Sequence, residues 1–276
     1  MHIRTLLVVI RPDQDDALLD RAIALAEGRH LRVLVVAEAP PAPASAYDML
    51  SGETWTLEVQ RARDWARERA NAVEAYLSDK AQPGDVVAHV AGAAGLADIV
   101  ASACRYADLV LVDEDQTGDR LLRHAIVTGA LFESGTPILI GDLPGGASLT
   151  PECVIVAWNA TPEAARAVKA ALPILKRARE VRLLLVDPVP TSLGHGEEPG
   201  ATLATYLGHH DIGCEVVKMP AEGHMVEEVI ADQVAAAGAD LLVMGGYGHS
   251  RLRERIFGGT TQAILDTPPC CTLMAH

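Results

Sequence analysis

The chain has 276 residues, a formal net charge of −14, 49% hydrophobic residues and only 4% aromatic residues. The acidity excludes a general nucleic-acid binder, because neutralising phosphates requires a basic face. No apolar run reaches the roughly 20 residues needed to span a bilayer. The length predicts two domains, and a core of Ala, Val, Leu and Ile is typical of parallel sheets covered by helices.

The N-terminal run "LLVVI" (residues 6–10) predicts a buried strand, since charge follows it at once and no small-residue cleavage site appears. Five scattered cysteines without a Cys-x-x-Cys pair indicate reduced thiols rather than a disulfide framework or a zinc site. We therefore expect a cytoplasmic protein without a membrane segment.

Farther along the first half, "LRVLVVAEAP" (residues 31–40) predicts a second strand and residues 53–79 predict a long amphipathic helix. One face of that helix carries an apolar stripe, formed by Trp55, Val59, Ala62, Ala66, Val73 and Leu77. Packing on the protein's own sheet explains the stripe, and a docking surface for a partner helix is the alternative. "ADLVLV" (residues 107–112) and "TPILI" (136–140) predict the last strands of this half.

The second half alternates strands and helices. "CVIVAW" predicts a strand, and "TPEAARAVKAAL" predicts a helix with Thr161 as its cap, Pro162 at the first position and Pro173 kinking or ending it. The strands "VRLLLV", "CEVVKM" and "LLVM" follow, with a helix from about 225 to 237 before the last. Short apolar strands joined by helical crossovers indicate an α/β fold with a doubly wound parallel sheet.

The two halves are copies of one domain. "LRVLVVAEAP" matches "VRLLLVDPVP" (residues 181–190), "ADLVLV" matches "ADLLVM" (239–244), and "TPILI" matches "CCTLM" (270–274), all in the same order. We predict domains at 1–142 and 151–276, joined by a turn-rich linker. We further predict that the two domains pack as a pseudo-twofold pair, with their short last strands covering each other.

A glycine-rich loop, "GGYGHSRLRERIFGGTT", follows the strand "LLVM". The loop does not follow the first strand, as the glycines of a Rossmann fingerprint do, and it does not end in the Gly-Lys-Ser/Thr of a Walker A loop. Its spacing is Gly245, two residues, Gly248, nine residues and Gly258. This pattern resembles the nucleotide loop of the universal stress protein family, and with the repeat it makes the chain similar to a tandem, two-domain member.

The resemblance implies two tandem domains of the adenine-nucleotide-binding kind, with ATP or AMP, and Mg²⁺ accompanying ATP, in the second half. Glycine turns expose backbone N–H groups, and the helix predicted after Gly259 would add its positive N-terminal end. The resemblance and these arguments give the expected nucleotide-binding residues as Asn159, Thr161, Val186, Gly245, Gly248, His249, Arg251, Gly258, Gly259, Thr260 and Thr261. We expect no catalytic or metal-ligating residues.

Two of these positions depart from the family pattern. Asn159 stands where family members usually have an acid, and Gly259 stands where Ser or Thr usually follows the third glycine. The first half departs further, because Asp113 aligns with Gly245 and His124 with Gly258. Its loop "DEDQTGD" would repel phosphate, so we expect at most one nucleotide per chain. A hard cation held by these acids is an alternative.

The leading functional hypothesis is a stress-response binding module, with an adenine nucleotide and an unidentified protein as partners. We expect the two halves of the chain to form an intrachain pseudo-dimer, and a further homodimer of whole chains is possible. No catalytic constellation is anchored to a motif. The alternatives are a nucleotide-free interaction scaffold and a slow nucleotide hydrolase.

Overall fold

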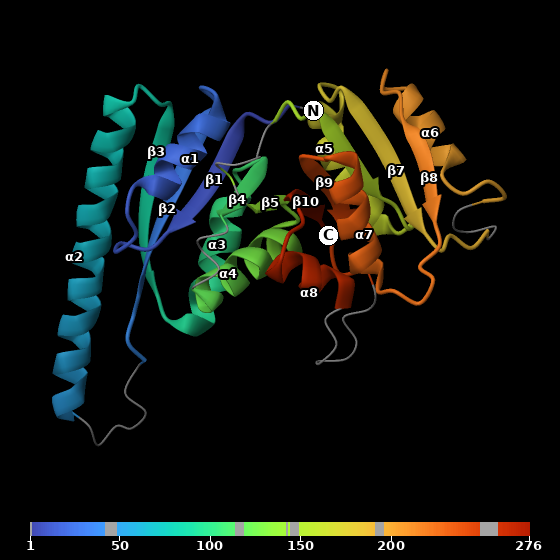
Figure 1. Ribbon diagram of the computed structural model, residues 1–276. Coiled ribbons are helices and arrows are strands. Elements are labelled where there is room, and N and C mark those ends of the chain that lie inside the picture. Colours follow the sequence, from blue (N-terminus) through green and yellow to red (C-terminus); the bar gives the residue numbers. More distant parts are fainter. Residues whose placement is uncertain are drawn as a thin grey trace. The chain divides into compact units, whose positions relative to one another are not determined.

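A computed structural model describes residues 2–41, 49–113, 119–141, 143, 149–190, 196–248 and 259–276, with the backbone alone for 49–52. The chain divides into two compact units, a first unit of Ile3–Thr136 and a second unit that contains Pro137–His276. Strands and helices alternate along each (Figure 1). Across the described residues, no helix combines the length and apolar character that a membrane crossing requires.

The first unit is a parallel sheet with the strand order β3-β2-β1-β4. Its elements in chain order are β1 (Thr5–Ile10), α1 (Ala17–Ala26), β2 (His30–Glu38), α2 (Met49–Asp79), β3 (Gly84–Ala91), the short η1 (Ala93–Gly95), α3 (Leu96–Cys104), β4 (Leu109–Asp113), α4 (Arg120–Val127) and the π-helical η3 (Thr128–Ser134).

The second unit repeats this plan with the strand order β5-β10-β9-β6-β7-β8. Its elements are β5 (Ile138–Gly141), β6 (Cys153–Ala157), α5 (Pro162–Leu175), β7 (Glu180–Val186), α6 (Ala201–Gly208), β8 (Glu215–Met219), α7 (Val226–Ala237), β9 (Leu241–Gly245), α8 (Gly259–Asp266) and β10 (Cys271–Ala275). All its strands run parallel except β5, which pairs antiparallel with β10.

These arrangements confirm the predicted α/β fold with mostly parallel sheets. The central strands are continuous apolar runs because helices bury both of their faces, as in residues Leu6 to Ile10, each fully buried. The pairing of β5 with β10 brings together "TPILI" and "CCTLM", the last strands of the two copies. The pseudo-twofold relation of the copies stays a prediction.

An aspartate in the same place ties each copy together. The Asp108 carboxylate accepts hydrogen bonds from the backbone N–H groups of Arg4 and Thr5, at 2.8 and 3.0 Å. The Asp240 carboxylate accepts the corresponding bonds from Glu152 and Cys153, at 2.9 and 3.0 Å. Asp108 directly precedes β4 and Asp240 directly precedes β9. Each aspartate thus holds the start of its copy's first strand next to the start of the strand that follows the aspartate.

The long helix α2 packs on its own sheet, which favours the first explanation of its apolar stripe (Figure 1). Ala66, Val73 and Leu77 are at most 3% exposed. A Cβ built on Gly84 would lie 3.0 Å from Leu77 Cδ1, so the even-numbered positions of β3 face α2. The odd-numbered positions of β3 therefore face the other side of the sheet.

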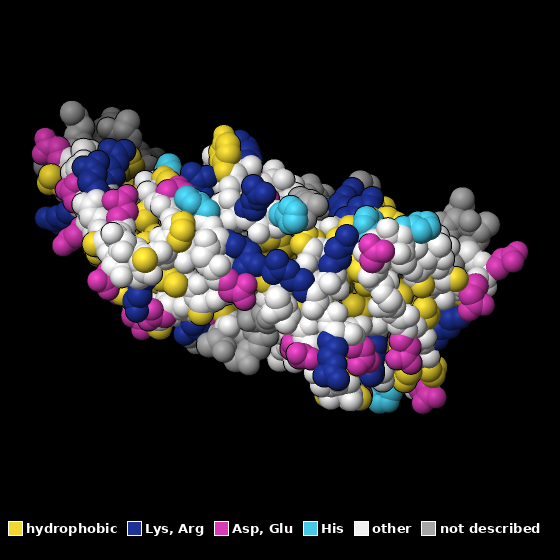
Figure 2. Space-filling view, turned by 90° about the horizontal axis from the view of Figure 1, so that it is seen from above, with side chains coloured by type: hydrophobic (Ala, Val, Ile, Leu, Met, Phe, Trp, Pro, Cys, Tyr) yellow, Lys and Arg dark blue, Asp and Glu magenta, His cyan; other side chains and the backbone are white. Residues whose placement is uncertain are grey.

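Two local details differ from expectation or refine it. Pro173 lies inside α5 and does not end it, since the helix continues to Leu175. Because proline has no N–H, the helix lacks the hydrogen bond that residue 173 would otherwise donate to the Lys169 carbonyl. His209 is the C-terminal cap residue of α6, before β8. On the face drawn in Figure 2, Lys and Arg side chains lie among Asp, Glu and His side chains.

Candidate functional site

The strand order of the second unit reverses at the carboxyl ends of β6 and β9. The chain passes from β6 outward to β7 and β8, and then returns to β9 on the other side of β6. Right-handed crossovers then place α5 and α7 on opposite faces of the sheet. Open α/β sheets bind ligands at such a reversal point. Asn159 follows β6 here, and Gly245 ends β9.

Gly245 is required by packing. A Cβ on this residue would lie 2.4 Å from the Ala164 backbone nitrogen and 2.7 Å from the Glu163 carbonyl carbon. The end of β9 therefore touches the first turn of α5. The left-handed residue of the following turn is Tyr247, with φ of +59°, whereas Gly245 and Gly248 have no positive φ. Tyr247 therefore takes the left-handed conformation of the turn, and close approach to α5 is what requires glycine at position 245.

Asn159 and Thr161 build the N-terminus of α5. The Asn159 Oδ1 atom accepts hydrogen bonds from the Thr161 hydroxyl at 2.8 Å and from the Thr161 backbone N–H at 3.3 Å. The Thr161 hydroxyl oxygen accepts in turn from the Ala164 N–H at 3.3 Å, as a helix cap. Asn159 therefore supports the helix start through its oxygen, and its amide nitrogen is the part of the side chain left for a ligand.

The N-terminus of α8 lies beside the same segment. The Tyr247 backbone N–H donates to the Thr261 hydroxyl at 3.2 Å, and Thr261 is 7% exposed. The Thr260 hydroxyl donates to Glu227 Oε2 at 2.8 Å, so its proton is already used within the protein. Thr261 accepts in its observed bond and keeps its own proton for a further acceptor.

Residues 245–248 thus lie between the N-terminal ends of two helices, α5 through the packing of Gly245 and α8 through the Tyr247–Thr261 bond. Each helix N-terminus carries a partial positive charge and unpaired N–H groups. Such an arrangement attracts an anion. The Gly246 N–H is committed to the Ala275 carbonyl at 2.9 Å, which holds the segment against β10.

Sequence reasoning missed two side chains of this site. Glu163 Oε2 lies 3.3 Å from the position of a Cβ on Gly248, is buried, and has no hydrogen-bond partner among the described residues. His276 places its Nδ1 atom 3.0 Å from the Gly246 carbonyl oxygen. Nothing in the spacing of the loop indicated either residue.

The structure gathers most of the predicted site residues at one edge of the second unit. Asn159, Thr161, Gly245, Gly248 and the start of α8 are linked by the contacts above. Gly259 begins α8, and no atom of the described residues would lie within 4 Å of a Cβ there. Val186 ends β7, next to β6, and is half-buried. His249, Arg251 and Gly258 lie outside the described residues.

In the first unit, ion pairs occupy the corresponding positions. Asp113, which aligns with Gly245, is 2% exposed and forms an ion pair with Arg21. The Arg21 Nη2 atom donates a hydrogen bond to Asp113 Oδ1 at 3.0 Å, and Arg21 Nε lies 3.0 Å from Asp113 Oδ2. Arg11, which follows β1 as Asn159 follows β6, donates from Nε to Asp119 Oδ2 at 2.9 Å. Glu114 and Asp115 lie outside the described residues.

Asp119 joins this network to α4. Its Oδ1 atom accepts from the Leu122 backbone N–H at 2.9 Å and caps the helix. Burial alone would raise the pKa of Asp119, but the hydrogen bonds from Arg11 and the Leu122 N–H outweigh it and lower that pKa. Asp119 is therefore ionised and paired with Arg11, and Asp113 is paired with Arg21, so a phosphate entering this site would have to break existing ion pairs.

Comparisons with known proteins agree with this geometry. Residues 152–276 match the family model described as the universal stress protein family. A search of curated protein sequences found no match.

Solved structures match over the whole chain. A universal stress protein from Archaeoglobus fulgidus DSM 4304 has a TM-score of 0.69 at 13% identity, covering 100% of this chain and 99% of its own. A putative universal stress protein from Pseudomonas aeruginosa UCBPP-PA14 gives 0.51 at 18% identity, covering 99% and 93%. A functionally unknown protein from Pseudomonas aeruginosa PAO1 gives 0.51 at 18%, covering 99% and 92%. The chain therefore has the fold of these structures, and its second half matches the universal stress protein family.

Proposed function

We propose that the second half of the chain binds one adenine nucleotide, ATP or AMP, and that the protein is a cytoplasmic stress-response binding module. One observation carries this proposal: residues 245–248 lie between the N-terminal ends of α5 and α8, at the reversal point of the sheet. This segment belongs to the part of the chain that matches the family model. Binding, rather than turnover, is the activity that this arrangement supports.

Specific groups would hold the phosphates. The Gly248 backbone N–H makes no hydrogen bond with a described residue, and the first-turn N–H groups of α8 point out of the helix start. The Thr261 hydroxyl can donate, and the Asn159 amide nitrogen is available to the base or sugar. With ATP, Mg²⁺ would offset the charge that the Glu163 carboxylate adds beside the phosphates.

The nucleotide-free scaffold is the second candidate, and specific contacts favour it. The Asn159 oxygen and the Thr260 hydroxyl proton are already used within the protein. The unpartnered oxygen of Glu163 faces Gly248 and would repel a phosphate placed there. In this case the chain would act through a protein partner alone, as an intrachain pseudo-dimer or a homodimer of whole chains.

The test combines ligand extraction with a matched pair of variants. The purified chain is denatured, and the released small molecules are identified by mass spectrometry; AMP or ATP supports the proposal, and ADP that accumulates with time supports slow hydrolysis. Gly248→Val places a branched side chain against Glu163 and should abolish binding, whereas Gly118→Val in the first loop should leave binding unchanged. A chain that neither releases nor takes up a nucleotide would establish the scaffold instead.

A further inference from the structure

A pocket of about 290 Å³ opens on the first unit, in a part of the fold that the proposed nucleotide site does not use. Its walls come from β2, β3 and α3. Val87 and His89 are odd-numbered positions of β3, so the pocket lies on the face of the sheet opposite α2. The strand β3 is the edge strand of this sheet, which leaves the pocket accessible from the side.

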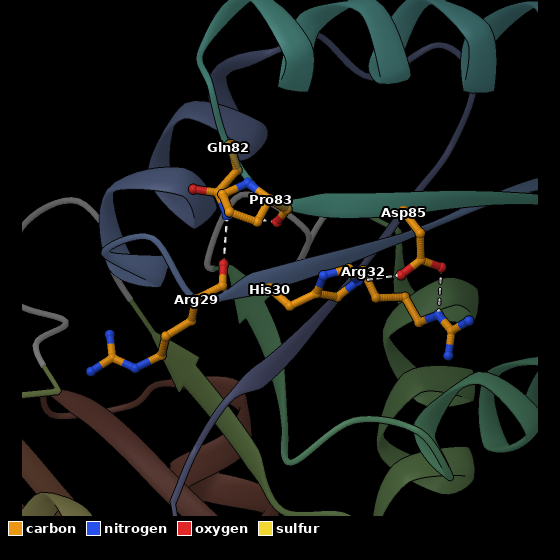
Figure 3. Close-up of polar contacts among 6 residues, drawn as sticks. All are labelled: Arg29, His30, Arg32, Gln82, Pro83 and Asp85. Atoms are coloured by element: carbon orange, nitrogen blue, oxygen red, sulfur yellow. Dashed lines mark hydrogen bonds and ion pairs between the residues drawn. The ribbon is translucent and has the colours of Figure 1, made fainter.

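One end of the pocket presents a fixed guanidinium group. The Arg32 Nε atom donates to Asp85 Oδ2 at 3.0 Å, and the other oxygen of Asp85 lies 2.6 Å from His30 Nε2. Figure 3 shows the two terminal nitrogens of Arg32 directed away from Asp85. They hydrogen-bond to no described residue, and the Arg32 Cζ atom lies 5.6 Å from the centre of the Tyr106 ring. This edge of the guanidinium can bind a carboxylate through two parallel hydrogen bonds.

The neighbouring contacts in Figure 3 hold the start of β2 in place. The Gln82 side-chain nitrogen donates to the backbone carbonyls of Arg29 and Pro83, at 2.6 and 2.9 Å. Gln82 is 8% exposed, so these bonds are shielded from water. The position of Arg32 is therefore fixed by the backbone beneath it as well as by Asp85.

The rest of the pocket is apolar along its floor and polar at the far end. Leu34, Val87, Ile99 and Ala103 supply aliphatic surface. His89 pairs in register with Val36, four residues beyond Arg32, which places the two ends roughly 13 Å apart at about 3.3 Å per residue. The exposed Asp98, in the first turn of α3, also lines the pocket.

The second copy of the domain keeps the arginine but not the rest of this arrangement. Arg182 matches Arg32 in the repeat and lies between two carboxylates, with Nε 2.5 Å from Glu180 and 3.7 Å from Glu215. Glu180 replaces His30, so the charge around Arg182 is net negative. Met219 stands where His89 does, in register with the end of β7, and Gly238 stands where Tyr106 does. The features that suit an anion are peculiar to the first copy.

We propose that the first unit binds a small organic carboxylate in this pocket, with its acid group on Arg32. A flat apolar body would lie on Leu34 and Val87, with one edge against Tyr106, and a hydrogen-bond donor at the far end would meet Asp98 or His89. The two copies then bind different ligands. The second copy keeps the glycine loop, whereas ion pairs fill the corresponding site of the first copy. The first copy instead binds its ligand on β2 and β3, on the face of the sheet that α2 does not cover.

The experiment uses the full chain and a fluorescent probe, 6-amino-2-naphthoate, with 6-amino-2-naphthamide as the uncharged control. Titration should show that the carboxylate binds at least tenfold more tightly than the amide. Ser102→Trp fills the pocket from an exposed position on α3 and should abolish binding, with thermal unfolding confirming that the variant folds. Arg32→Gln should weaken binding at least tenfold, whereas Arg182→Gln, the same change in the second copy, should have no effect.

Four results would overturn the proposal. These are no binding of the naphthoate at millimolar concentration, equal binding of acid and amide, an unchanged affinity in folded Ser102→Trp, and displacement of the probe by ATP. Retained binding in Gly248→Val would support it, because this substitution lies in the proposed nucleotide site of the other unit.

Discussion

The substitution Gly245→Ala tests whether this glycine of the loop serves packing. The added Cβ would lie 2.4 Å from the Ala164 nitrogen and 2.9 Å from the Ala164 Cα. Ordinary contacts begin near 3.5 Å, so the end of β9 and the first turn of α5 must separate by about 1 Å. Both partners are backbone and cannot rotate away. Overpacking of this kind costs typically 1–3 kcal/mol, and we expect the upper end, about 3 kcal/mol.

Scanning calorimetry of the full chain measures this cost. A loss of about 3 kcal/mol should lower the unfolding temperature of the second unit by roughly 6–12 °C. The matched control is Gly248→Ala, whose Cβ would lie 3.3 Å from the tip of the Glu163 side chain, a group that can move. The control should cost less than about 1 kcal/mol. Equal unfolding temperatures for Gly245→Ala and the unmodified protein would refute the packing argument.

The observed contacts and burial lead to three further predictions. Asp119→Ala removes a helix cap and the bond to Arg11, and should cost about 1–2 kcal/mol at neutral pH. The pKa of Asp119 is lowered below its ordinary value of 3.8, so this contribution to stability is present above about pH 4 and is lost as the pH falls through the folded-state pKa. Chemical denaturation should therefore show a smaller difference in unfolding free energy between the unmodified protein and Asp119→Ala at pH 2.5 than at pH 7. Thr161→Ala should cost about 1 kcal/mol by uncapping α5, and faster hydrogen exchange confined to the first turn of α5 would show it. Burial raises the pKa of the Cys104 and Cys270 thiols to about 12, so both should resist alkylation by iodoacetamide at pH 8 in the folded protein, and early labelling of either in peptide mass spectra would contradict the burial.

The fold was predictable because its signals are local. Buried parallel strands are apolar throughout, so runs such as residues 31–36 and 181–186 stand out, and their repetition in order reveals the duplication. The cap at Thr161 was predictable for the same reason, since the capping residue and the proline after it are neighbours in sequence.

The site was predictable only in part, because its contacts join distant residues. The pairing of Arg21 with Asp113 spans 92 positions, and no local pattern indicates it. The left-handed φ falls on Tyr247, although two glycines stand nearby, because packing fixes Gly245 in another role. The oxygen of Glu163 faces Gly248 only once α5 meets β9.

The central claim is that one adenine nucleotide binds per chain, in the second half. Titration calorimetry with ATP and with AMP measures both the stoichiometry and the affinity. We predict one site per chain, and a roughly tenfold to hundredfold gain in the variant carrying Asn159→Asp and Gly259→Ser, because a hydrogen bond to a charged group contributes about 1.5–3 kcal/mol. Aspartate at 159 keeps the oxygen that Thr161 needs, and a side chain at 259 would meet no atom of the described residues within 4 Å of its Cβ. Two sites per chain, or binding that survives Gly248→Val, would contradict the account.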